Sequence, residues 1–78
     1  MSRKKVFLTF PQKLMKEPLL WKIGQEFEVV TNIRGASITD ELALLALLLE
    51  GEPEEIDKVI DYLSERGVTV ENLQDEEE

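Results

Sequence analysis

Hydrophobic residues along this chain follow strand or helix spacing in several stretches, and one stretch is apolar without a break. That stretch is Leu42–Leu49, reading Leu-Ala-Leu-Leu-Ala-Leu-Leu-Leu, with Glu41 before it and Glu50 after it. At about 3.3 Å per residue it is long enough for a full-length β-strand. Every position is apolar, so both faces of such a strand require cover. We therefore predict a central strand here.

The same run has a helical alternative, because leucine and alanine are strong helix formers and weak strand formers. Thr39 or Asp40 could cap such a helix, and Gly51 could end it. A helix of this composition would be apolar on all sides, and a 78-residue chain is too small to bury it on every side. The strand is the better interpretation.

Five further segments follow the periods of regular elements. Alternation and β-branched residues predict strands at Lys5–Phe10, Val29–Ile33 and Val68–Leu73. Apolar residues three and four positions apart predict helices at Pro18–Phe27 and Glu52–Arg66. The order strand, helix, strand, strand, helix, strand predicts an α+β ferredoxin-like fold. In that fold one four-stranded antiparallel sheet carries both helices on one face.

The second face of that sheet is expected to be apolar. One side of the central strand would present Leu42, Leu44, Ala46 and Leu48, and the other Ala43, Leu45, Leu47 and Leu49. Either way three leucines stay uncovered, and burying them is worth about 6 kcal/mol, at about 2 kcal/mol each. Such a patch usually marks an interface or a ligand groove. We predict a homodimer interface formed by Phe7, Val30, Leu45, Leu47 and Leu49.

The amino-acid composition limits the kinds of chemistry that the chain can perform. The chain has no cysteine and no histidine, which removes disulfides, thiol nucleophiles, imidazole bases and the usual zinc ligands. The net charge of −8 argues against nucleic acid and anionic membranes as partners. No segment approaches the ~20 apolar residues of a membrane span. We expect one cytoplasmic domain over residues 4–73, followed by an acidic disordered tail over residues 74–78.

Two polar residues fall on the side of the predicted second strand that carries Val30. Asn32 can donate and accept hydrogen bonds, and Arg34 can pair with a carboxylate through two parallel bonds. Beside an apolar floor they suit a zwitterion with an apolar side chain. The alternatives are that Arg34 is a solvated charge at the sheet edge and that Asn32 ties down the next turn.

The ordered set of segments resembles the NIL domain family. The likeness runs through Val6-Phe7-Leu8-Thr9-Phe10, Pro18-Leu19-Leu20, Phe27-Glu28-Val29 and Asn32-Ile33, and continues in Leu44–Gly51 and Leu63–Val70. The family is named for an Asn-Ile-Leu triplet, and this chain reads Asn32-Ile33-Arg34, so its third position departs.

The resemblance implies a regulatory module related to amino-acid-sensing ACT domains. NIL domains of methionine-import transporter ATPases bind methionine near the interface of a domain pair. The resemblance implies that Asn32 is the first ligand contact. It implies that Ile33 is a second ligand-site residue, which contributes more by packing. Arg34 would redirect ligand choice or block the pocket. The expected partners are a second copy, an amino acid such as methionine, and a transporter or enzyme. The alternative is a ligand-free interaction module. We expect no catalysis, cofactor or metal.

Overall fold

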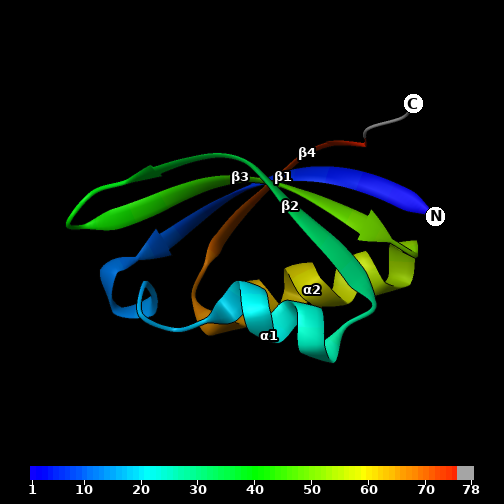
Figure 1. Cartoon of the computed structure of the whole chain (residues 1–78), viewed down its shortest axis with the longest axis horizontal. Helices are drawn as coiled ribbons and strands as arrows, with labels where there is room; N and C mark the ends of the chain where they lie inside the picture. Colours follow the sequence, from blue (N-terminus) through cyan, green and yellow to red (C-terminus); the bar gives the residue numbers. More distant parts are fainter. Residues whose placement is uncertain (76–78) are drawn as a thin grey trace.

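The computed structural model describes residues 1–75. Along this part of the chain the elements are β1 (Ser2–Pro11), the short 3-10 helix η1 (Gln12–Leu14), α1 (Leu19–Glu26), β2 (Val29–Ile38), β3 (Leu42–Gly51), α2 (Pro53–Arg66) and β4 (Thr69–Asp75). The strands form one antiparallel sheet in the order β2-β3-β1-β4. Figure 1 shows this sheet as one layer with both helices packed beneath it. The predicted ferredoxin-like α+β fold is confirmed.

The apolar run forms the strand β3, as predicted. β3 lies between β1 and β2, so both of its edges pair with neighbouring strands. Leu47 and Leu49 are completely buried, and Leu48 is 1% exposed. Both faces of this part of the strand are therefore buried, which outweighs the weak strand propensity of leucine.

Pairing with β1 decides which face of β3 meets the helices. Val6 lies opposite Leu47 and Leu8 lies opposite Leu45. Residues directly opposite in an antiparallel pair share a face, and the Val6 and Leu8 side chains belong to the buried core. The helix-covered set is consequently Ala43, Leu45, Leu47 and Leu49. The open face of β3 carries the other set, Leu42, Leu44, Ala46 and Leu48.

Two amphipathic helices close the core from below. The buried residues of the helices are Leu19, Ile23, Ile56, Val59 and Leu63. The Phe27 and Tyr62 rings meet edge to face at 5.6 Å between centroids, which joins the end of α1 to α2. Gly67 ends α2 with a left-handed φ of 102°, a conformation that glycine adopts readily just after a helix.

Each strand extends beyond its predicted C-terminal end. β1 is longer than predicted at both ends. β2 continues through Gly35 to Ile38, because a bulge at Arg34 lets the strand resume its pairing with β3. The turn between β2 and β3 therefore follows Ile38. In this turn the Thr39 hydroxyl accepts hydrogen bonds from the backbone N–H groups of Glu41 and Leu42 at 3.3 and 3.2 Å. β4 takes in residues 74 and 75 of the predicted tail, and residues 76–78 lie outside the described residues.

Candidate functional site

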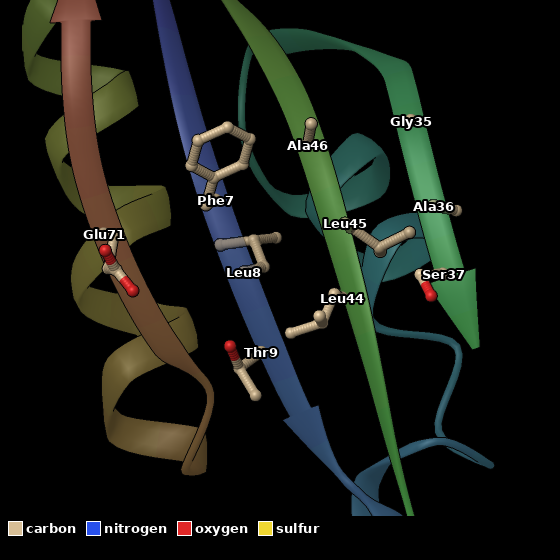
Figure 2. Close-up of a pocket in the computed structure, with 10 residues that line it drawn as sticks. All are labelled: Phe7, Leu8, Thr9, Gly35, Ala36, Ser37, Leu44, Leu45, Ala46 and Glu71. Carbon is tan, nitrogen blue, oxygen red and sulfur yellow. The ribbon is translucent and has the colours of Figure 1, made fainter. Parts of the chain in front are cut away.

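An apolar groove of about 420 Å³ lies on the open face of the sheet. Its lining includes Phe7, Thr9, Gly35, Ser37, Leu44, Ala46 and Glu71. Figure 2 shows the Phe7 ring beside Ala46, and no side chain at Gly35 on the neighbouring strand. Phe7 is 42% exposed and Leu44 is 46% exposed. Apolar surface of this kind is the usual floor of a small-molecule site.

One row of cross-strand partners forms the middle of the groove. Gly35 of β2 lies opposite Ala46 of β3, which lies opposite Phe7 of β1, which lies opposite Glu71 of β4. Two small residues thus sit next to an aromatic ring, and a carboxylate stands at the far strand. The hollow exists because the two small residues are neighbours on adjacent strands.

The opposite end of the open face is polar and closed. Glu50 accepts a hydrogen bond from the Asn32 side-chain amide at 3.1 Å. Its other carboxylate oxygen lies 3.1 Å from the Arg3 Nε, so Glu50 links three adjacent strands. Leu48 belongs to this end of the face, between its cross-strand partners Lys5 and Asn32, and it is nearly inaccessible. The accessible apolar surface of β3 is therefore concentrated at the groove.

The structure separates the three predicted ligand residues. Asn32 lies on the open face beyond one end of the groove and bonds to Glu50 rather than to the following turn. Ile33 pairs with Leu47, so it lies on the helix side of the edge strand, and it is 58% exposed. Arg34 is the extra residue at the bulge next to Gly35. Asn32 and Arg34 thus precede the groove residue Gly35 along β2, and Asn32 shares its face, whereas Ile33 belongs to the other face.

Two of the five residues predicted for a homodimer interface lie on the open face of the sheet, and the other three lie on the helix-covered face. Phe7 and Val30 are exposed, and their register places both on the open face. Leu45, Leu47 and Leu49 instead pack toward the helices as part of the core or against it. The alternation of a fully apolar strand leaves two equivalent choices, and only the register with β1 selects one. Leu44 is the exposed leucine of the open face.

Sequence reasoning missed most of the groove. Gly35, Ala46, Ser37 and Glu71 were not singled out, although one signal was available. In the open-face set of β3, Ala46 is the one small residue among leucines. Its glycine neighbour on β2 could not be found from sequence, because the bulge at Arg34 changes which residues of β2 face outward.

A second apolar cleft, of about 290 Å³, lies on the helix side at the end of the β2–β3 hairpin. Trp21 and Ile38 line it and are 64% and 69% exposed. Within residues 1–75, no group of acidic side chains is arranged to hold a metal ion. None of the helices in that range is long and apolar enough to cross a membrane.

Fold and surface together define a small α+β domain with an apolar groove on its uncovered sheet face. The NIL domain family model matches residues 4–72, and the chain belongs to this family. It is similar to the C-terminal domain of an ABC transporter ATP-binding protein from Enterococcus faecalis. That match has 28% identity and a TM-score of 0.80, and covers 90% of this chain and 82% of the other.

A de novo designed protein, Foldit4, shares the fold. It is 9% identical, with a TM-score of 0.57 and coverage of 99% of this chain and 97% of the designed one. At that identity the likeness concerns the fold alone. No curated protein matches the chain at a significant level.

Proposed function

We propose that this NIL domain is a regulatory module that binds a free amino acid with an apolar side chain, methionine first, in the open-face groove. The observation that carries the proposal is the groove itself. Its volume of about 420 Å³ lies within the range of roughly 300–1,000 Å³ typical of small-molecule pockets. Family membership and the similarity to a transporter ATPase domain support the same reading. The role is binding, without catalysis.

Polar residues at the ends of the groove suit the charged head of an amino acid. Glu71 lies in the groove lining, and its carboxylate can accept from an ammonium group. Asn32 and Arg34 precede Gly35 on β2, so in this proposal the Asn32 amide carbonyl also accepts from the ammonium and the Arg34 guanidinium pairs with the carboxylate. We assign no ligand contact to Ile33, because its register places it on the other face.

The groove supplies only one wall of a site, and this supports a homodimer. Ligands in protein sites are typically covered over about 70–90% of their surface. A ligand on the open face of one copy would keep its outer side in water. A second copy placed over Phe7, Val30 and Leu44 would cover both the ligand and these exposed side chains. We place the module in the cytoplasm, acting on a transporter or enzyme partner.

Binding is tested by thermal unfolding and calorimetry against a panel of amino acids. A ligand at one hundred times its dissociation constant stabilises the folded state by about 2.7 kcal/mol. For a domain of this size that raises the Tm by roughly 11–22 °C. Saturable heat and a matching rise in Tm with methionine are expected. No heat and no shift with any amino acid in the panel would overturn the proposal.

The second candidate is a ligand-free interaction module, and the edge strand β2 favours it. Val30, Ile33 and Ile38 are each more than half exposed on this strand. Exposed apolar edge strands tend to pair with other chains. This candidate predicts a concentration-dependent dimer whose Tm no amino acid changes. Leu44→Lys should split a dimer formed through the open face while the far-UV spectrum stays native. Sedimentation analysis of both proteins decides between these outcomes.

A further inference from the structure

A carboxylate at the closed end of the open face contacts a residue of the proposed site. Through one oxygen the Glu50 side chain accepts a hydrogen bond from the Asn32 Nδ2 at 3.1 Å. Its other oxygen lies 3.1 Å from the Arg3 Nε. Arg3 lies directly opposite Glu50 on β1, and Asn32 lies opposite Leu48 on the other side of β3. Glu50 therefore lies between a cation on one neighbouring strand and an amide on the other.

The chemistry of this contact fixes the orientation of the Asn32 amide. An amide has a donating NH2 group at one end and an accepting carbonyl oxygen at the other, whereas an ionised carboxylate only accepts. The end that faces Glu50 is therefore Nδ2. Because Nδ2 and Oδ1 diverge from the same carbon atom, the Asn32 Oδ1 faces away from Glu50. Without the carboxylate, the amide could turn over and present either end.

The side away from Glu50 is the side of the groove. Along the open face of β3, Leu48 separates Glu50 from the groove residue Ala46. Asn32 is the cross-strand partner of Leu48, so along the sheet it lies between Glu50 and the groove. The oriented amide consequently presents an acceptor on the groove side. An acceptor at this place suits a donating group such as an ammonium, and disfavours a carboxylate.

The ion pair with Arg3 keeps the Glu50 carboxylate in place. The two side chains are 23% and 25% exposed, and they come from directly opposite positions on neighbouring strands. Opposite charges in such cross-strand positions stabilise one another. A carboxylate held in this way can orient a neighbouring amide, whereas a carboxylate that moved freely in solvent could not.

We infer that Glu50 is a positioning residue of the groove, which turns the Asn32 carbonyl toward the ligand so that this end accepts an ammonium group. The inference rests on the proposed function and adds to it a residue that acts through Asn32 without touching the ligand. Hydrogen bonds to charged groups contribute about tenfold or more to an equilibrium constant. The wild-type domain should therefore bind methionine about tenfold more tightly than the analogue of methionine that lacks the amino group.

The test is a double-mutant cycle measured by calorimetry with methionine. Asn32→Ala and Glu50→Ala should each weaken binding about tenfold. The double variant should bind no more weakly than Asn32→Ala alone, because Glu50 then has no amide to orient. Glu50→Ala should also reduce the preference for methionine over the analogue. Glu55→Ala is the matched control, since Glu55 also accepts a side-chain hydrogen bond but lies on α2, and its affinity should equal that of the wild type.

The outcomes separate the positioning role from the proposed function. Wild-type protein that binds no methionine overturns the proposed function, and the positioning role with it. Wild-type protein that binds methionine and the analogue equally overturns the positioning role alone. So do losses that add in the double variant, because Glu50 would then contact the ligand itself or only stiffen the sheet. If Glu50→Ala does not fold, Glu50→Gln replaces it in the cycle. Its single amide oxygen serves both Arg3 and Asn32, so its loss should be smaller and should vanish in the Asn32→Ala background.

Discussion

The two faces of β3 can be compared with one pair of substitutions, Leu47→Ala and Leu44→Ala. Both change the same residue type on the same strand, three positions apart and on opposite faces. Leu47 is fully buried in the core, whereas Leu44 is 46% exposed on the open face. The structure therefore predicts a large loss of stability for Leu47→Ala and a small one for Leu44→Ala.

The magnitudes follow from what each truncation removes. Leu47→Ala removes fully buried carbon atoms and leaves a cavity beside Val6, which costs about 2–5 kcal/mol. Three carbons at about 0.8 kcal/mol each, scaled by the half that is covered, give about 1 kcal/mol for Leu44→Ala without a cavity. Against a total stability of roughly 4–12 kcal/mol, the first change is severe and the second is mild.

Thermal unfolding followed by circular dichroism measures both variants. In dilute protein, the Tm should fall by about 8–40 °C for Leu47→Ala and by about 4–8 °C for Leu44→Ala. If the open face forms the proposed dimer, the loss for Leu44→Ala should grow with protein concentration. Equal losses in dilute protein would refute the assignment of faces. Leu47→Lys should give no folded protein, because it buries an ammonium group without a partner.

Two further predictions concern α2. Glu55 accepts hydrogen bonds from Lys58 and from the Glu28 backbone N–H. Both bonds lower the pKa of the Glu55 carboxyl from its ordinary value of 4.5, and the bond from Lys58 has the larger effect. A lowered folded-state pKa gives stability that is present above the unfolded pKa and lost as pH falls through the folded one. The Tm advantage of wild type over Glu55→Gln should therefore be constant near neutral pH and decline below about pH 4.5; an advantage that persists at pH 2 would contradict this. Gly67→Ala should cost about 1–2 kcal/mol of stability, because alanine is strained at the left-handed φ of this position. Gly24→Ala, within α1, should be neutral or stabilising. Denaturant titrations measure both variants, and equal effects would show that backbone conformation is not the cause.

Several features were readable from the sequence because they depend on local pattern. The two helices follow from apolar residues three and four positions apart, and Gly67 marks the end of α2. The unbroken apolar run predicted a central strand, and β3 is that strand. The order of elements then permitted only a few topologies, one of which is the fold observed. The same pattern carried the resemblance to the NIL family, which the family match confirms.

Other features were decided by the tertiary structure. A strand that is apolar at every position has no polar face, so alternation cannot say that Leu47 points inward and Leu44 outward. That choice is made by the pairing of β3 with β1, where Val6 lies opposite Leu47 and Leu8 lies opposite Leu45. The groove likewise depends on a bulge at Arg34, which brings Gly35 opposite Ala46. Register and bulges are set by contacts between strands distant in sequence, so the residues of the proposed site became visible only when the sheet was assembled.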